Sequence, residues 1–128
     1  MKKKILLSPL LILLLLSCGI GRNLSSPVSR MVGHWQGNKG NEYYFGPIGS
    51  QGVGELTVVG NGGSISFDSY QIYQEQNDGV AFSRMEEGNN WAIIIPPDGK
   101  TADIHALTGY YRDKVEELRY VDGKTSRW

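Results

Sequence analysis

The chain has 128 residues, enough for one domain and too few for two. Hydrophobic residues make up 40% of it, which supports a packed core and argues against wholesale disorder. The 13 basic and 13 acidic residues balance, but Lys2, Lys3 and Lys4 precede residue 18, where no acidic residue lies. The rest of the chain therefore has 10 basic and 13 acidic residues, a net charge of −3, which argues against a nucleic-acid partner.

The three lysines lead into a 12-residue run, residues 5–16, in which only Ser8 and Pro9 are not apolar. A helix that spans a bilayer needs about 20 apolar residues, so this run is too short to remain as a membrane span. A basic start followed by a short apolar run is typical of a secretory signal peptide, which is removed after export. We therefore expect residues 1–17 to be a signal peptide.

The segment Leu15-Leu16-Ser17-Cys18-Gly19 resembles the lipobox of bacterial lipoproteins, in which a small residue precedes an obligatory cysteine. The resemblance implies cleavage after Ser17, a diacylglyceryl thioether on Cys18, and a mature protein held by palmitate-type acyl chains on a membrane of the bacterial cell envelope. Gly19, in place of an acidic residue, implies the outer membrane if the host is diderm. An ordinary secretory signal with an incidental cysteine is the alternative.

Cys18 is the only cysteine, so its acylation would leave no thiol for a disulfide, a catalytic thiolate or a cysteine-ligated metal. The fold must then depend on its core alone. Residues 19–30 mix small, polar and helix-breaking residues without periodicity. We expect residues 18–30 to be the acylated cysteine and a flexible tether, with a reach of roughly 20 Å.

Residues 31–128 are expected to form an all-β domain, because short alternating runs are separated by Gly, Asn, Asp and Pro. The expected strands are 32–37, 42–46, 55–59, 64 onward, 80–85, 91–95, 101–107 and 115–121. The alternation shifts phase between Phe67 and Tyr70, which predicts a β-bulge or a bend near Asp68 and Ser69. Residues 113–121 also suit a helix by propensity, but their alternation favours a strand.

Eight short strands with tight connections are most simply a meander closed into a small barrel, because closure removes exposed edges; a β-sandwich is the alternative. The alternation predicts these inward-facing residues: Trp35, Tyr43, Phe45, Leu56, Val58, Ile65, Phe67, Tyr70, Ile72, Val80, Phe82, Trp91, Ile93, Ile95, Ala102, Ile104, Ala106, Leu118 and Tyr120. Eight of them are aromatic. Such bulk favours a filled interior, although an eight-stranded barrel can hold one small ligand.

Gly33-His34-Trp35, followed by Tyr43-Tyr44-Phe45 and a glycine-rich turn, resembles the opening of lipocalin-like domains, whose first strand carries Gly-x-Trp. The chain is shorter than full lipocalins and lacks their long C-terminal helix. The resemblance implies that Trp35 closes one end of the barrel beneath a late arginine, either Arg119 or Arg127. It further implies that a small apolar ligand would bind near Trp35, Tyr43, Tyr70, Trp91 and Arg119.

Catalytic motifs are scarce in this sequence, which has no Gly-x-Ser-x-Gly, His-Glu-x-x-His or phosphate-binding loop. Asp103 and His105 share a strand face and could bind a metal or pair as a base and its partner, but a solvent-facing polar edge explains them better. His34 is expected to be an ordinary surface residue. The adjacent Glu116 and Glu117 point to opposite faces and cannot share a reaction centre. We expect no enzyme, no metal and no cofactor.

Several apolar residues remain on the outward face: Tyr44, Val59, Tyr73, Ile94, Leu107, Val121 and the C-terminal Trp128. If they cluster, they form a patch of the kind found at interfaces; alternatively, the C-terminal tail folds over Ile94. Two functions are compatible with these features. One is a non-catalytic lipoprotein that contacts an envelope protein or a cell-wall component, and the other is a lipocalin-like carrier of a small apolar ligand.

Overall fold

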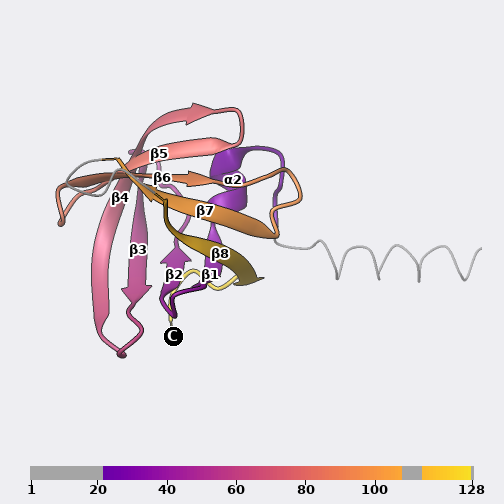
Figure 1. Cartoon of the computed structure of the whole chain (residues 1–128). Coiled ribbons are helices and arrows are strands. Elements are labelled where there is room, and N and C mark those ends of the chain that lie inside the picture. Colours follow the sequence, from indigo (N-terminus) through magenta and orange to yellow (C-terminus); the bar gives the residue numbers. More distant parts are fainter. Residues whose placement is uncertain (1–21, 108–113, 128) are drawn as a thin grey trace, which may run out of the picture.

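The chain folds into a closed barrel of eight antiparallel strands in sequence order, as a computed structural model of residues 22–107 and 114–127 shows (Figure 1). The strands are β1 (Gly33–Gly37), β2 (Glu42–Phe45), β3 (Val53–Val59), β4 (Ile65–Gln76), β5 (Gly79–Arg84), β6 (Asn89–Ile94), β7 (Thr101–Ala106) and β8 (Lys114–Asp122). The predicted meander barrel is confirmed, and it is consistent with the lipocalin-like resemblance of its first strand. The predicted signal peptide, Cys18 and Trp128 lie outside the described residues.

Strand β8 closes the barrel by pairing with both β7 and β1. In this register Trp35 lies opposite Tyr120 and Gln36 lies opposite Arg119. The strand interpretation of this segment, preferred over a helix, is therefore confirmed. Its alternation buries Glu116 and exposes Glu117, so the two adjacent carboxylates face opposite sides as predicted.

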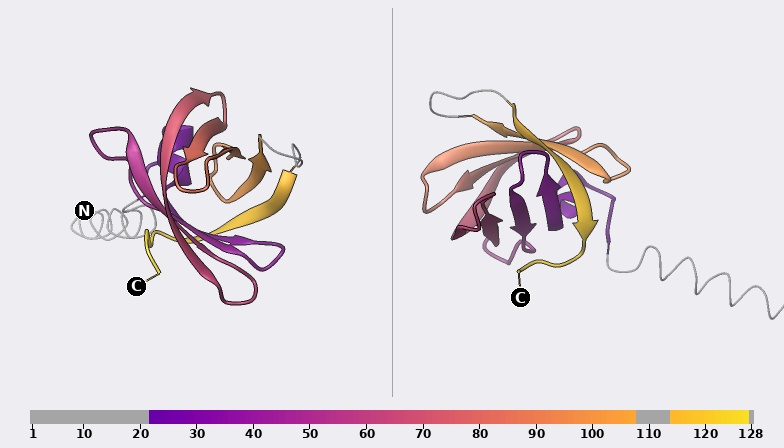
Figure 2. Two further views of the ribbon diagram at one scale, coloured as in Figure 1. Left: turned by 90° about the vertical axis from the view of Figure 1, so that its left-hand side faces the viewer. Right: turned by 60° about the horizontal axis from the view of Figure 1, so that its bottom comes forward.

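A short helix, α2 (Pro27–Met31), precedes the barrel and lies close against its strands (Figure 2). Ser26 caps the helix by accepting a hydrogen bond from the Ser29 amide, and Pro27 occupies the first turn, where its missing N–H costs nothing. The expectation of a flexible tether as far as residue 30 is therefore wrong over the helix. Local periodicity could not reveal it, because a helix of five residues is too short to show a hydrophobic face.

Arg30 fastens α2 to the barrel although it is nearly buried. Its guanidinium donates to the Ile95 carbonyl through Nε at 3.3 Å and Nη2 at 3.1 Å, and to the Leu24 carbonyl through Nη1 at 3.1 Å. Nη2 also lies 3.1 Å from an Asp78 carboxylate oxygen. These charge-assisted contacts join α2 to the β4–β5 turn and to the end of β6.

The inward-facing residues form one continuous core, largely as the alternation predicts. Two predictions are wrong, because Ile65 is 38% exposed and Phe67 is 61% exposed. In β4 the inward-facing side chains are instead Asp68, Tyr70 and Ile72. These are alternate residues, so the same face of the strand stays inward from Asp68 to Ile72. The irregularity in the pairing of β4 with β5 lies between Ile72 and Gln74, not at the predicted residues 68–69. Asp68 is thus an inward-facing residue, and the two apolar residues before it face outward.

The outward apolar residues do not all face solvent. Tyr73, Ile94, Leu107 and Val121 are exposed, as predicted, but Tyr44 and Val59 are buried on the outer wall. Tyr44 stacks on His34, with ring centroids 4.1 Å apart. Ile94 is 43% exposed, so the described tail does not cover it, and Trp128, the other part of that expectation, lies outside the described residues.

Candidate functional site

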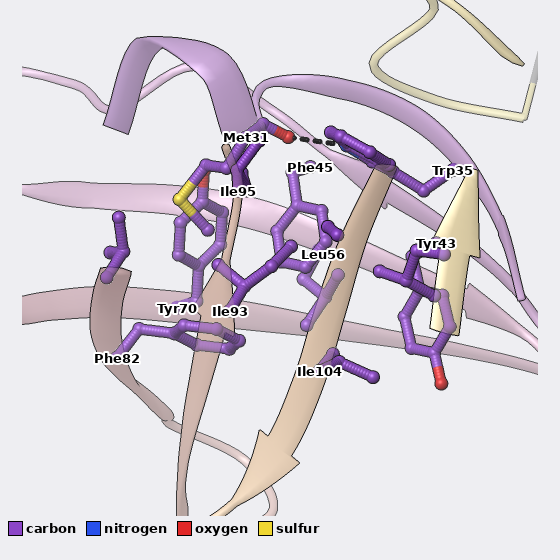
Figure 3. Packing of buried hydrophobic residues seen from close by; sticks show 13 residues of the cluster. Met31, Trp35, Tyr43, Phe45, Leu56, Tyr70, Phe82, Ile93, Ile95 and Ile104 are labelled. Atoms are coloured by element: carbon purple, nitrogen blue, oxygen red, sulfur yellow. Dashed lines mark hydrogen bonds between the residues drawn. The ribbon is translucent and has the colours of Figure 1, made fainter. Parts of the chain in front are cut away.

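The centre of the barrel is occupied by aromatic side chains (Figure 3). The Phe45 ring packs edge-to-face against Tyr70 and Phe82, with centroids 5.5 and 5.7 Å away, and Tyr70 packs against Phe82 at 5.6 Å. All three side chains are fully buried. Edge-to-face packing at these separations is the favourable geometry for aromatic rings, so these rings leave one another little space for a ligand.

The aromatic residues predicted to bind a ligand mostly use their polar groups within the protein. Trp35 Nε1 donates to the Met31 carbonyl at 2.9 Å, and the Tyr70 hydroxyl donates to the Gly46 carbonyl. Tyr43 is buried in the same core, and Trp91 packs against it while partly exposed. The four aromatic residues therefore belong to one core, in which the described contacts are structural.

The predicted ligand residue Arg119 does not join this group, because it is exposed on the opposite face of β8 from Leu118. The arginine that covers Trp35 is instead Arg22, near the N-terminus. Its guanidinium carbon lies 3.4 Å from the centroid of the Tyr120 ring and 5.8 Å from that of Trp35, and its Nη2 donates to the Gly99 carbonyl. Burial lowers the pKa of Arg22, opposed by the nearby Tyr120 and Asp98. The resemblance thus anticipated a stacked arginine but assigned it to the wrong end of the chain.

A buried carboxylate lies inside the barrel where β1 turns into β2, and it was missed from the sequence. Glu116 is 2% exposed and accepts hydrogen bonds from the Lys39 amide at 3.1 Å, Asn41 Nδ2 at 2.8 Å and the Tyr43 hydroxyl at 2.5 Å. Burial and the bond to Glu116 raise the pKa of Tyr43 well above its usual value of 10. A Cβ atom at Gly37 would collide with this carboxylate, so any larger residue there would have to displace it.

A second buried carboxylate, Asp68, forms an ion pair inside the barrel wall. Its Oδ2 lies 3.0 Å from Arg84 Nε, and its Oδ1 accepts from the Ser69 and Glu86 amides at 2.8 Å. The Arg84 guanidinium also lies 5.8 Å from the Trp91 ring centroid. The contacts of Asp68 with Arg84 and with the Glu86 amide join β4 to β5 and to the turn after β5, which indicates a structural role.

The two histidines lie on different strands, and each has acidic residues near it. His34 is 8% exposed, not a surface residue as expected, and lies between Glu42, at 2.9 Å from Nε2, and Asp122, at 3.4 Å from Nδ1. Asp103 and His105 are half-buried, and the Asp103 carboxylate lies 3.9 Å from Lys114 Nζ. Within residues 22–107 and 114–127, no three His, Cys, Asp or Glu side chains gather as metal ligands.

The outer wall carries a groove of about 590 Å³ across β1, β7 and β8. Polar residues surround it: Gln36, Asn38, Thr101, Asp103, Glu117 and Arg119. Gly37, Ala102 and Leu118 also line it, although the side chains of Ala102 and Leu118 are buried in the barrel core. This volume falls within the range of roughly 300–1,000 Å³ that is typical of ligand sites, and the outward-facing side chains offer hydrogen-bond donors and acceptors. The predicted site residue Arg119 thus lies in a groove outside the barrel, not in a cavity within it.

The charges around the groove are of both signs. Glu117 lies 2.9 Å from Lys114 Nζ, and this contact lowers the pKa of Glu117 and raises that of Lys114. The Asp103 carboxylate lies 3.9 Å from the same Lys114 ammonium group. Arg119 is exposed on the same face of β8, two residues after Glu117. A guanidinium in this position can bind a carboxylate through two parallel hydrogen bonds.

No family model matches this chain, and no curated protein or solved structure shows significant similarity to it. In the part of the chain that the structure describes, no helix is long and apolar enough to span a bilayer.

Proposed function

We propose that this protein is a lipid-anchored component of the bacterial cell envelope and that its barrel is a non-catalytic binding module for an envelope protein or a cell-wall component. The outer groove of β1, β7 and β8 is the proposed binding surface. One contrast supports this choice: fully buried aromatic rings occupy the barrel interior, whereas a groove of about 590 Å³ is open on its wall.

The lipid anchor rests on the sequence pattern. The basic start, the apolar run and the single cysteine at its end together match the lipoprotein signal, and Cys18 would carry the acyl chains. Two or three acyl chains hold a protein durably on a membrane, whereas one does so only marginally. Mass spectrometry of the protein purified from its native host tests this directly. An acylated N-terminal Cys18 supports the anchor, and an unmodified cysteine or a retained leader refutes it.

The groove is tested with a photoreactive amino acid placed in the full-length protein in its native host. We expect discrete crosslinked adducts from positions 103 and 119, which line the groove, and none from position 74, an exposed residue of β4. In the variant labelled at position 103, the substitution Arg119→Glu should reduce the adduct at least tenfold. Equal labelling from position 74, or no adduct from either groove position, would refute the groove as the binding surface.

A cell-wall partner is distinguished from a protein partner by sedimentation with purified insoluble cell wall. A wall ligand should carry the wild-type protein into the pellet and leave Arg119→Glu in the supernatant. A protein partner should leave both in the supernatant and give the crosslinked adducts above.

A carrier of a small apolar ligand is the second candidate, because an arginine stacks beside Trp35 as the lipocalin-like resemblance implies, although it is the early Arg22 and not a late arginine. Titration with a fatty acid, followed by tryptophan fluorescence, tests this function. Saturable quenching with a one-to-one end point would support the carrier. The filled interior predicts no saturable change up to high micromolar ligand.

A further inference from the structure

The described chain begins at one end of the barrel, where three segments meet. The Val28 amide of α2 donates to the Glu75 carboxylate at 2.8 Å, and Arg30 binds Asp78, so α2 lies beside the β4–β5 turn. Arg30 also binds Ile95, which leads into the β6–β7 connection of residues 95–100. We call this end, formed by α2, the β4–β5 turn and the β6–β7 connection, the helix end of the barrel.

Arg22 fixes the incoming chain to the helix end. Its Nη2 donates to the Gly99 carbonyl and lies 3.5 Å from the Arg30 carbonyl, and its guanidinium stacks on Tyr120. Figure 1 shows the described chain starting beside the β6–β7 connection, on the same side as α2. The point at which the chain joins the barrel is therefore defined by contacts with three separate segments.

Arg22 follows Cys18 by four positions, with three residues between them. Even when fully extended, four residues span at most about 14 Å. The 12 residues of β4, by comparison, have a length of about 40 Å along the strand, which bends over the barrel (Figure 1). β4 runs from the β3–β4 turn, at the bottom of Figure 1, to the β4–β5 turn at the helix end. Acyl chains on Cys18 would thus hold the helix end much closer to the bilayer than the β3–β4 turn.

The surface of the helix end suits contact with lipid headgroups. Leu24 is 39% exposed and Ile94 is 43% exposed, and the β6–β7 connection adds the exposed residues Pro96, Pro97, Asp98 and Lys100. Small apolar groups flanked by a lysine are compatible with the interface of a bilayer, where the apolar parts lie near the acyl boundary and the charge stays in water.

We propose that the helix end faces the membrane and contacts its lipid surface, while the β3–β4 turn projects away from it. The inference rests on the proposed acylation of Cys18. It adds an orientation that the proposed function does not contain, and it assigns the exposed residues of the helix end to a lipid partner.

Short-range quenching by a nitroxide on lipid headgroups tests the orientation. The full-length protein, purified from the membranes of its host, carries a fluorescent amino acid at position 97 or, as the matched control, at position 62 in the β3–β4 turn. It is then reconstituted in phosphatidylethanolamine–phosphatidylglycerol vesicles that contain the nitroxide lipid. We expect at least fivefold stronger quenching at position 97. Equal quenching, or stronger quenching at position 62, would overturn the proposal.

A longer connection provides the second arm of the test. Insertion of twenty Gly and Ser residues between Ile20 and Gly21 should lower the quenching at position 97 toward that at position 62, because the chain would no longer hold the helix end near the bilayer. Unchanged quenching at position 97 would show that the short connection does not orient the barrel, and would overturn the proposal.

Failure of the lipid anchor remains distinguishable from failure of the orientation. Mass spectrometry of the same preparation reports whether Cys18 is acylated. If it is not, its free thiol, the only one in the sequence, is coupled to vesicles with maleimide headgroups, which imposes the same separation of four positions from Arg22. Stronger quenching at position 97 would then support the orientation by itself, and equal quenching would refute it.

Discussion

Replacement of Glu116 by glutamine should lower the free energy of unfolding by about 2–3 kcal/mol, because it removes an acceptor from a buried site in which every partner is a donor. The amide oxygen can take the place of Oε2 and still accept from Asn41 and Tyr43. The amide nitrogen then replaces Oε1 and opposes the Lys39 N–H, which leaves two buried donors facing each other. For a domain of this size, the loss corresponds to a fall in melting temperature of about 10–15 °C.

The adjacent Glu117 provides the matched control, because its side chain is exposed. The described ion pair of its carboxylate is with Lys114. Glu117→Gln should leave the melting temperature unchanged within error. Both variants are compared with the wild type by urea unfolding and thermal denaturation at neutral pH. If Glu116→Gln is as stable as Glu117→Gln, the acceptor role of the buried carboxylate is wrong.

Three further predictions concern other buried polar groups. Burial raises the pKa values of Tyr43 and Tyr70, so their stabilising effect is complete below pH 10 and is lost above it, by about 1.4 kcal/mol per pH unit for each residue. Tyr70→Phe should therefore reduce the alkaline slope in urea unfolding by about 1.4 kcal/mol per pH unit; an unchanged slope would contradict this assignment. Asp68→Asn should cost about 3–5 kcal/mol in the same assay by leaving Arg84 buried without its partner, and a cost below 1 kcal/mol would refute that. Arg30→Ala should release α2 and speed proteolysis within residues 22–31; wild-type resistance would show that α2 does not need Arg30.

The barrel could be predicted because its strands are separated by strong turn residues and because each strand alternates with a period of two. Asn61 and Gly63 in the β3–β4 turn, and Gly99 before β7, bound strands whose inward faces are rich in aromatic and branched residues. Short connections predicted a meander, which left a sandwich as the alternative to a closed barrel, and the pairing of β8 with β1 is what shows closure.

The phase of β4 could not be predicted, because alternation shows that two faces exist but not which one is buried. Ile65 and Phe67 are apolar, so local hydrophobicity assigned them to the core. The actual choice depends on pairing: Leu56 lies opposite Asp68, and Arg84 supplies the partner that allows the carboxylate to point inward. That compensation comes from a residue 16 positions away, which no local pattern reveals.

The candidate site shows the same limit. Arg119 was selected as a residue that would cover Trp35, but the register of β8 on β1 places Tyr120 opposite Trp35 and turns Arg119 to the outer wall. Arg22 covers Trp35 instead. Its segment carries no periodicity, so only its contacts with Gly99 and Tyr120 could have identified it.

By itself the sequence determined the strands, the turns and most of the core, because these depend on propensities and alternation within a few residues. It also carries the motif from which the lipid anchor is proposed. The tertiary structure alone decided which carboxylates are buried, which arginine stacks on the barrel, and where the outer groove lies. Each of these depends on groups brought together from distant strands, and their energies are set by desolvation and by the partners present after folding.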